Sequence, residues 1–398
     1  MKVLITGIAG FIGSHVAELC LKMGMTVYGI DDLSGGSREN VPEGVTFLHG
    51  SASTQARYLR QSGHVFDAIY HLAAYAAEGL SHFIRHYNYT NNLLETVDLV
   101  NEAVKGLLKD GGRFVFTSSI AVYGHMPEDV WYAHEVLRPH PCDPYGVSKL
   151  ACEMDLAAAA EMWPGKFNYT IFRPHNVVGI RQNLADNYRN VVGIHLRQAL
   201  TGEPLRIFGD GKQTRQFSDV SDVAPYIAVC PTLPNTVNQT YNIGGDTPYT
   251  VLDVADAVRR AVCAQGIDVR LQFEEARKEV VHIACDHTKL KRDFGITKEP
   301  VTLSESVAKM AEWAKDRVIE QPKPFTGIEV HEGMPPSWAK FGAVSSEKAD
   351  TKEAGRLANE KTRLEITTIS HLYHIPLAEA SRLTPSERET MLTCAELS

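Results

Sequence analysis

The sequence predicts an α/β fold in which a doubly wound parallel sheet is followed by a smaller C-terminal lobe and a C-terminal extension. Up to about residue 180, short β-branched runs alternate with longer amphipathic segments. This alternation is typical of a parallel sheet that helices cover on both faces. Beyond that point the pattern loosens into segments such as LRIFGDG and YNIGG, which indicates a second lobe. With 398 residues, of which 44% are hydrophobic, the chain can fill both cores.

The individual elements follow from these patterns in chain order. Strands are expected at 2–6, 26–31, 45–49, 68–72, 113–118 and 169–173, and helices at 11–23, 83–109 and 145–163. The third of these helices has a clear start, because Asp143 can cap it and Pro144 occupies its first position. In the lobe, helices are expected near 250–264 and 302–317.

The C-terminal part of the chain has a different composition. A proline-rich stretch at 322–336 ends the compact part, and residues 345–365 are dominated by Glu, Lys, Ala and Arg. That composition favours an exposed helix, so we expect a linker followed by a helical or partly disordered tail. The chain therefore divides into three expected parts, 1–180, 181–320 and 321–398, and some later segments return to the first part.

The overall charge and the cysteines exclude several classes of protein. With 40 basic and 48 acidic residues, the net charge of -8 offers no basic field for nucleic acid or an anionic membrane surface. Any anionic ligand must therefore be met by local positive charge. The seven cysteines form no CxxC pair and no metal-binding spacing, so we expect reduced thiols and no metal site. The chain begins with the apolar strand MKVLITG and has no apolar run long enough to span a membrane, so a cytoplasmic protein is expected.

A glycine-rich turn between the first strand and the first helix predicts a dinucleotide site. Gly7, Gly10 and Gly13 in TGIAGFIG lack side chains, so backbone N–H groups can approach a pyrophosphate. The second strand ends in Asp31 and Asp32, about 20 residues further on, where a carboxylate accepts hydrogen bonds from the adenosine ribose. Because a carboxylate there repels the 2'-phosphate of NADP, the predicted cofactor is NAD.

A tyrosine and a lysine predict the catalytic chemistry. Tyr145 and Lys149 lie one helical turn apart in YGVSK and project from the same face. An ammonium near the phenol lowers the tyrosine pKa from about 10 toward the working pH, so that the tyrosine can exchange a proton with a substrate hydroxyl. The preceding strand ends in Ser118 and Ser119, where a doubly wound sheet places its ligand crevice. Ser119 is therefore expected to bond the same hydroxyl.

Several motifs in register resemble one known family. In chain order they are TGIAGFIG, DDLSGGSREN, YHLAA, FTSSIAVYG, DPYGVSK, RPHNVVG, IFGDGKQTRQF and YNIGG, and they span roughly residues 1–315. Together they resemble the extended short-chain dehydrogenase/reductase family, specifically its NAD-dependent nucleotide-sugar epimerases such as UDP-glucose 4-epimerase. The resemblance implies a Rossmann-type NAD-binding domain over 1–180 and a lobe over 181–320 that binds a UDP-sugar substrate. It also implies a homodimer in which 83–109 and 145–163 of each subunit form a four-helix bundle.

The resemblance also implies roles for individual residues. The catalytic residues would be Ser119, Tyr145 and Lys149. The residues implied to line the cofactor are Gly7, Gly10, Phe11, Ile12, Gly13, Asp31, Asp32, Ser51, Ala52, Leu72, Ala73, Ala74, Asn92, Tyr145 and Lys149, with His71 beginning the stretch that continues to Ala74. The residues implied to meet the substrate are Ser119, Asn176, Arg181, Arg189, Arg215 and Arg277. Arg215 would supply the local positive charge for the diphosphate.

The reaction is expected to be epimerisation at C4. Members of this family begin by moving a hydride from the sugar to NAD while the tyrosine takes the hydroxyl proton. Related dehydratases carry an Asp-Glu pair directly after the position of Ser119, and a decarboxylase would carry Glu in place of Ala121. Here those positions are Ile120 and Ala121, and a 4-epimerase needs no further acid or base.

Other reactions and roles stay open at this point. A 3,5- or 2-epimerase needs another general base, for which His82, His86, His125 and His175 are candidates, and a 4,6-dehydratase is a further alternative. A non-catalytic NAD-binding regulator or scaffold on the same fold would be expected to lose Tyr145 or Lys149. The unusual run VVGIRQN, followed by DNYRNVVG, places Arg181, Gln182, Asn187 and Arg189 where the sugar pocket is expected. These residues suggest a sugar that bears a carboxylate.

Overall fold

The computed structural model describes residues 1–127, 129–276, 280–319, 322, 325–335, 338, 381, 383 and 384. The chain forms two compact units, of which the first comprises Met1–Lys323 and Glu329–Glu332 and the second comprises Pro324–Ile328 and Gly333–Ser398. The helix expected within 345–365 lies outside the described residues.

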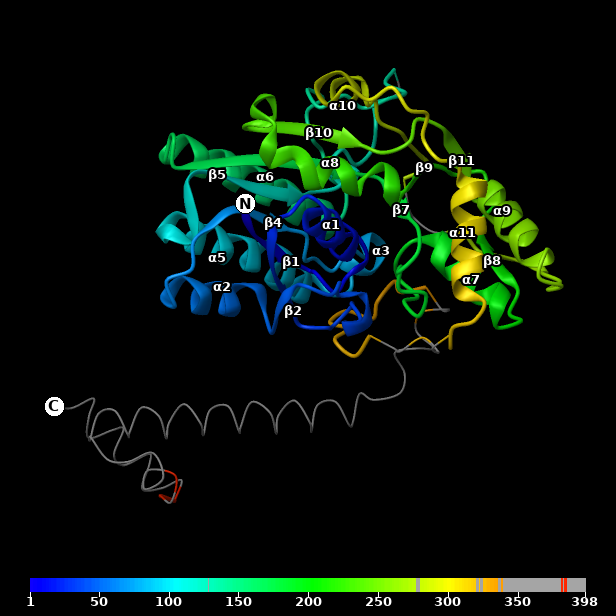
Figure 1. The fold of residues 1–398 in the computed structure, drawn as a ribbon. Coiled ribbons are helices and arrows are strands. Elements are labelled where there is room, and N and C mark those ends of the chain that lie inside the picture. The colour runs from blue at the N-terminus through cyan, green and yellow to red at the C-terminus, as the bar shows by residue number, and fades with distance from the viewer. Residues whose placement is uncertain are drawn as a thin grey trace. The chain divides into compact units, whose positions relative to one another are not determined.

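The central sheet of the first unit has the predicted doubly wound architecture (Figure 1). Within the described residues it contains seven parallel strands in the order β10-β6-β5-β4-β1-β2-β3. Their bounds are β1 (Lys2–Thr6), β2 (Thr26–Asp31), β3 (Thr46–His49), β4 (Phe66–His71), β5 (Leu108–Thr117), β6 (Phe167–Pro174) and β10 (Gln239–Ile243). The strand order reverses between β1 and β4, and that is the point at which open α/β sheets bind their ligands.

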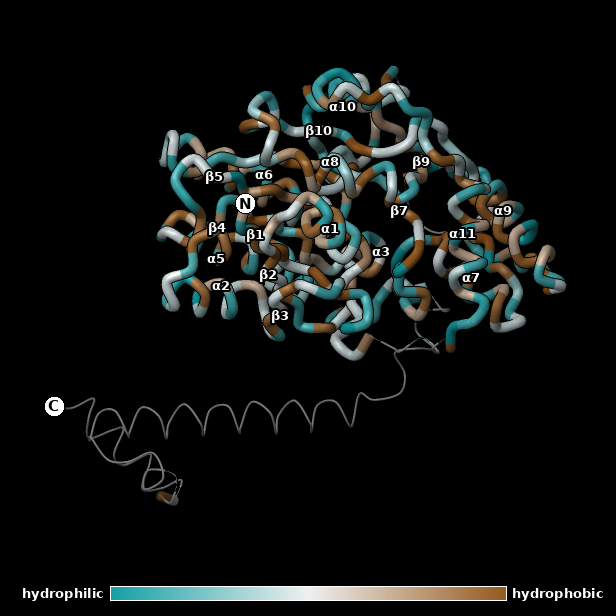
Figure 2. The backbone as a smooth tube through the Cα atoms, viewed as in Figure 1, coloured by the Kyte–Doolittle hydropathy of each residue, from teal (hydrophilic) through white to brown (hydrophobic). Residues whose placement is uncertain are grey.

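Helices pack on both faces of this sheet. On one face, α1 (Phe11–Lys22) and α8 (Ala224–Val229) share an apolar core with β1 and β4. On the other face, α2 (Ala52–Gln61), α5 (Glu95–Glu102) and α6 (Pro144–Met162) pack against the same strands. Figure 2 shows brown, hydrophobic segments running through the middle of this arrangement. Buried strands explain why the sequence reads as short β-branched runs.

The helix expected at 83–109 is confirmed over most of its length, because this segment is helical without a break from Arg85 to Lys105. It contains α4 (Arg85–Asn88), the π-helical turns η2 (Tyr89–Leu94) and η3 (Ala103–Leu107) on either side of α5, and the first residues of β5. Gly106 ends the helical stretch at a φ of 108°, a conformation that favours glycine. The short helix α3 (Glu78–Ser81) precedes it. The start of α6 is as predicted, since Asp143 Oδ1 accepts the Gly146 N–H at 2.8 Å.

The second lobe lies at the right of Figure 1 and has its own apolar core. Its helices are α7 (Val191–Leu200), α9 (Val251–Cys263) and α11 (Leu303–Ala314), while α10 (Thr288–Phe294) packs near β10. Its strands are β7 (Asn176–Val178), β8 (Leu205–Phe208), β9 (Thr214–Asp219), β11 (Pro248–Thr250), β12 (Leu271–Glu274) and β13 (His282–Ile283). The short 3₁₀ turns are η1 (Arg38–Asn40), η4 (Ile120–Val122), η5 (Val220–Asp222), η6 (Cys230–Thr232) and η7 (Pro234–Thr236).

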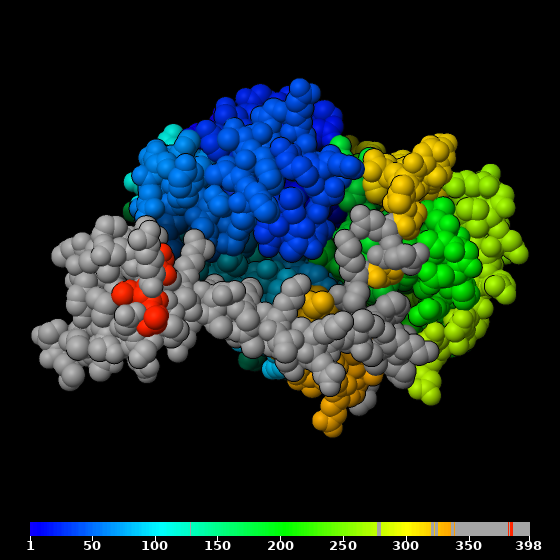
Figure 3. All heavy atoms as spheres, turned by 90° about the horizontal axis from the view of Figure 1, so that it is seen from below, coloured from blue at the N-terminus to red at the C-terminus, as the bar shows by residue number. Residues whose placement is uncertain are grey.

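Two capping boxes fix the helices predicted near 250–264 and 302–317. Thr250 with Asp253 opens α9, and Thr302 with Glu305 opens α11. Seen from below, the blue surface of the N-terminal elements meets the green surface of the lobe (Figure 3). No helix in the part of the chain that the structure describes is both long and apolar enough to cross a membrane.

Candidate active site

The glycine turn closes against the segment that follows β4. Gly7 has a φ of +72°, and a Cβ placed on it would lie 2.7 Å from the Ala73 nitrogen. A Cβ on Gly13 would overlap the carbonyl oxygen of Gly7. Gly10 caps α1 without a side chain, so the first-turn N–H groups of this helix face the turn with no intrahelical acceptor. The turn therefore fits the pyrophosphate of a dinucleotide.

The carboxylate of Asp31 joins the glycine turn to the end of β2. Its Oδ2 accepts the Ala9 N–H at 2.9 Å and its Oδ1 accepts the Leu33 N–H at 2.8 Å. Burial raises the pKa of this carboxyl. Asp32 is exposed and accepts the Ser34 N–H at 2.9 Å. Because each carboxylate oxygen has two lone pairs, both residues keep acceptor capacity for ribose hydroxyls.

The cofactor stretch after β4 is held by a buried asparagine. Asn92 Oδ1 accepts the Tyr75 N–H at 2.8 Å, and Asn92 Nδ2 donates to the Tyr75 carbonyl at 3.1 Å. Asn92 lies on the π-helical turn η2, which directs its side chain at this loop. It therefore fixes the end of the Leu72 to Ala74 stretch through the backbone of Tyr75.

The other residues expected near the cofactor have structural partners. His71 lies 2.7 Å from Thr6 Oγ1 and 2.9 Å from Thr96 Oγ1, and burial lowers its pKa to about 3, so it stays neutral. Ser51 caps α2 by accepting the Thr54 N–H at 3.3 Å, and Ala52 is the first residue of that helix.

The structure brings the three expected catalytic residues together at the carboxyl end of β5. Ser119 lies beside the Tyr145 phenol and acts to lower its pKa, and Ser119 Oγ accepts the Ala121 N–H at 3.1 Å. Lys149 Nζ lies 5.9 Å from the centre of the Tyr145 ring and donates to the Thr117 carbonyl at 2.8 Å. The exposed fractions are 6% for Ser119, 5% for Tyr145 and 2% for Lys149. Water is therefore largely excluded from the group.

The tyrosine pKa differs from the sequence expectation. In the protein alone burial raises the pKa of Tyr145, and the charges of Glu78 and Asp143 raise it further. The neighbouring Ser119 hydroxyl and the Arg189 charge act in the opposite direction, and burial outweighs them. The lysine ammonium is held by a backbone carbonyl, and burial lowers its pKa to about 8. The expected lowering of the tyrosine pKa is thus wrong for the protein by itself.

Asn176 and Arg215 lie on paired strands of the lobe. Asn176 begins β7 and donates to the Gln216 carbonyl at 3.2 Å. Arg215 on β9 donates to the Thr214 carbonyl at 2.8 Å and to the Val280 carbonyl at 2.6 Å. Both side chains are half-buried. Arg277 lies outside the described residues.

The two other arginines of the expected sugar pocket are paired with carboxylates. Arg181 Nη2 lies 2.8 Å from Glu18 on α1. Arg189 Nε lies 2.9 Å from Asp186, and its guanidinium lies over the Tyr75 ring at 4.9 Å. Sequence reasoning missed Tyr75, Glu78 and Asp186, although Tyr75 directly follows YHLAA. Glu78 begins α3 and Asp186 lies in a loop, and neither carboxylate has a sequence signal that reveals its partner.

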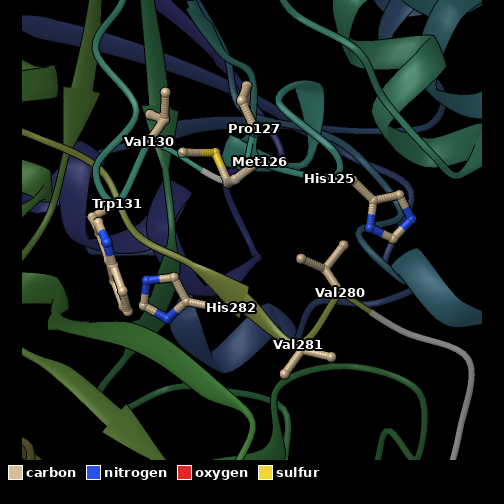
Figure 4. A pocket seen from close by; sticks show the side chains of 8 residues that line it. All are labelled: His125, Met126, Pro127, Val130, Trp131, Val280, Val281 and His282. Carbon is tan, nitrogen blue, oxygen red and sulfur yellow. The ribbon is translucent and has the colours of Figure 1, made fainter.

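The histidines considered as extra bases have other surroundings. His175 is buried, lies 3.2 Å from Ser218 Oγ, and has its pKa lowered by burial. His125 lines a hollow of about 340 Å³ together with Trp131 and His282, which lie beside each other in Figure 4. The hollow adjoins Arg215, because Val280 also lines it.

Comparison with known proteins places the chain in a family. The sequence model of the NAD dependent epimerase/dehydratase family matches residues 3–244. The chain belongs to this family. NAD is the cofactor of such enzymes, and the glycine turn, Asp31 and the Leu72 to Ala74 stretch fit it.

Three relatives illustrate the range of the family. The structure of UDP-glucose 4-epimerase from Thermotoga maritima, solved with UDP-glucose, is 31% identical and covers 79% of this chain and 98% of its own, with a TM-score of 0.70. The structure of UDP-glucuronic acid 4-epimerase from Bacillus cereus, solved with UDP-glucuronic acid and NAD, is 27% identical over 79% and 98%, with a TM-score of 0.68. UDP-glucuronic acid decarboxylase 1 of Arabidopsis thaliana is 26% identical over 81% of this chain and 71% of the relative.

Proposed function

We propose that this chain is a 4-epimerase of a UDP-linked hexose or hexuronic acid that acts through a transient 4-keto sugar, with Tyr145 as the base. The observation that carries the proposal is the buried cluster of Ser119, Tyr145 and Lys149, in which the lysine ammonium lies 5.9 Å from the centre of the tyrosine ring. Bound NAD supplies the hydride acceptor and, in its oxidised form, a positive charge that lowers the pKa of a nearby phenol. On this proposal residues 1–180 and β10 bind NAD, and 181–320 binds the nucleotide sugar.

In the proposed mechanism the chain's own residues take one proton from the C4 hydroxyl of the sugar and later return it. Tyr145 takes the proton of the C4 hydroxyl as that carbon becomes a ketone, and Ser119 holds the same oxygen by donating a hydrogen bond. The Lys149 ammonium stabilises the phenolate electrostatically inside this buried site. After the ketose has turned its other face, Tyr145 returns the proton to the C4 oxygen.

The residues beside Ser119 favour epimerisation over elimination or decarboxylation. Ile120 and Ala121 are buried apolar side chains with exposed fractions of 4% and 6%. They cannot protonate a leaving hydroxide or take up a proton. Glu78 is the carboxylate whose charge acts most strongly on Tyr145, and a 4-epimerase does not require it.

The charges of the lobe support a diphosphate more than a sugar carboxylate. On this proposal the half-buried Arg215 on β9 binds the diphosphate. Arg181 pairs with Glu18, and the Nε of Arg189 pairs with Asp186, so carboxylates of the chain already compensate part of the charge that the sequence offers to a sugar carboxylate. The neutral hexose is therefore the preferred substrate.

An assay with three nucleotide sugars tests the proposal. Purified protein is incubated with UDP-glucose, UDP-N-acetylglucosamine and UDP-glucuronic acid, and the products are followed by NMR with and without added NAD. We expect the C4 epimer of at least one sugar at unchanged mass. Carbon dioxide release would instead indicate a decarboxylase, and NAD binding without turnover would indicate the non-catalytic regulator.

Exposed apolar side chains on α6 support the expected homodimer. Val147, Met154 and Met162 on this helix are 41%, 65% and 69% exposed, and Leu94 on η2 is 53% exposed. Val147 and Met154 lie seven residues apart and therefore on one face of the helix. A second copy of the chain that packs this face against itself would bury them in a four-helix bundle.

A further inference from the structure

The segment from Gly179 to Asn190 follows the first helix of the cofactor site. His15 Nε2 on α1 lies 3.1 Å from the Ile180 carbonyl, and Arg181 pairs with Glu18 one turn further along the same helix. Gly179 packs against Phe11, the first residue of α1. Residues 179–190 precede helix α7 of the second lobe, but these contacts join them to α1 of the NAD-binding domain.

The same segment also reaches the loop that follows β2. Asn183 Nδ2 donates to the Gly35 carbonyl at 3.3 Å, and Arg189 Nη2 lies 2.8 Å from the position that a Cβ on Gly35 would take. The neighbouring Gly36 packs on the glycine turn, since its Cβ would lie 2.6 Å from the Ala9 carbonyl carbon. Gly35 thus contacts the Arg189 guanidinium, and the next residue, Gly36, contacts the backbone of the glycine turn.

Two further contacts hold the guanidinium in this place. Asp186 binds its Nε, and the Tyr75 ring lies under its face. Tyr75 directly follows the Leu72 to Ala74 stretch, which packs on Gly7. The charge of Arg189 also acts on the phenol of Tyr145. Arg189 thus lies next to the glycine turn, and its charge also influences the pKa of Tyr145 at the catalytic end of the site.

We infer that residues 179–190 form a clasp over the dinucleotide cleft, and that Arg189 holds the cofactor phosphates rather than the sugar. An arginine fork matches phosphate oxygens well, and a contact of this kind contributes most when water is excluded. The inference rests on the proposed function in one respect. An epimerase must return the hydride to the same sugar, so its cofactor has to stay bound between the two transfers.

The rate at which NAD leaves the full-length protein tests the clasp without any sugar. Protein loaded with NAD is mixed with excess fluorescent etheno-NAD, and the exchange is followed for wild type, Arg189→Gln, Arg189→Lys and Arg60→Gln. The last variant is a matched control, because Arg60 also pairs with a carboxylate, Glu102 at 2.5 Å, between α2 and α5. Loss of a charge-assisted phosphate contact raises the exit rate about 10- to 100-fold.

The expected result is fast NAD exit for Arg189→Gln, partial rescue by lysine and no change for Arg60→Gln. The dissociation constant for UDP should stay within a factor of about two for all variants. The clasp is refuted if Arg189→Gln keeps NAD as long as wild type. If that variant also binds UDP more weakly, Arg189 is a substrate-binding residue. If wild type releases NAD slowly but turns over no sugar, the proposed function is refuted and the clasp is not.

Discussion

The ammonium of Lys149 lies 5.9 Å from the centre of the Tyr145 ring and donates to the Thr117 carbonyl, not to the tyrosine hydroxyl. Ser119 lies beside that hydroxyl and acts to lower its pKa. In the proposed mechanism the serine orients the base, and the lysine acts on it through its charge. This arrangement separates positioning from electrostatics, and the two can be tested apart.

Removing the tyrosine hydroxyl should abolish turnover and leave binding intact. Tyr145→Phe is expected to lower kcat by about 10²- to 10⁴-fold, because general base catalysis typically contributes this much. Steady-state kinetics and NAD content check the prediction. Tyr70→Phe is the control, since Tyr70 is also a buried tyrosine and donates to the Ala228 carbonyl at 2.7 Å, away from Ser119. A similar loss in both variants would contradict a special role for Tyr145.

Glu78 provides a test of the pH dependence. Its charge raises the pKa of Tyr145, so Glu78→Gln lowers that pKa and makes the base form available at lower pH. The rising limb of kcat/KM against pH should therefore move to lower pH, with the maximal rate within about threefold of wild type. A collapse of the rate at every pH would instead show that Glu78 is an additional acid or base, as a 3,5-epimerase or a dehydratase requires.

The buried ammonium of Lys149 should lower the stability of the folded protein at neutral pH. Burial lowers its pKa from 10.5 to about 8, so the folded state disfavours the charged form, and stability rises as pH increases from about 8 to 10.5. That difference corresponds to about 3 kcal/mol at pH 7. Lys149→Met should unfold at a higher temperature than wild type at pH 7, with the advantage shrinking above pH 10, while activity is lost. Lower stability at pH 7 would show that the Thr117 contact outweighs desolvation.

The glycine turn should not tolerate a methyl group. A Cβ at position 13 overlaps the Gly7 carbonyl, so Gly13→Ala must displace the turn and is expected to lose bound NAD. NAD released from denatured protein measures this directly. Gly63→Ala serves as the control, because a Cβ on Gly63 would meet open space, although its φ of 78° is positive. It should cost about 1 kcal/mol of stability and keep NAD.

A charge on the exposed face of α6 should separate the proposed dimer. Met154→Glu places a carboxylate at a side chain that is 65% exposed in the single chain, so folding of the chain should not suffer. Mass measurement by light scattering during size exclusion is expected to show a dimer for wild type and a monomer for the variant. Identical masses would place any interface elsewhere.

The sequence predicted the sheet well, because buried parallel strands carry continuous β-branched runs that local patterns reveal. It also predicted that Ser119, Tyr145 and Lys149 lie together, since strand ends and helical spacing determine where they meet. The helix at 83–109 was predicted over most of its length, but its π-helical turns and the left-handed Gly106 were not, because neither has a periodic signature. The ion pair of Arg181 could not be predicted from the sequence, since its partner Glu18 is 163 residues away in the chain.

The fate of the carbon-bound hydrogens tests the central claim most directly. The protein is incubated with UDP-glucose in deuterated water, and the product is examined by NMR and mass spectrometry. Epimerisation at C4 by reversible hydride transfer predicts the C4 epimer at unchanged mass, with no deuterium on carbon. Deuterium at C3 or C5, or loss of water, would contradict the account, because either result requires an acid or base that abstracts a proton from carbon.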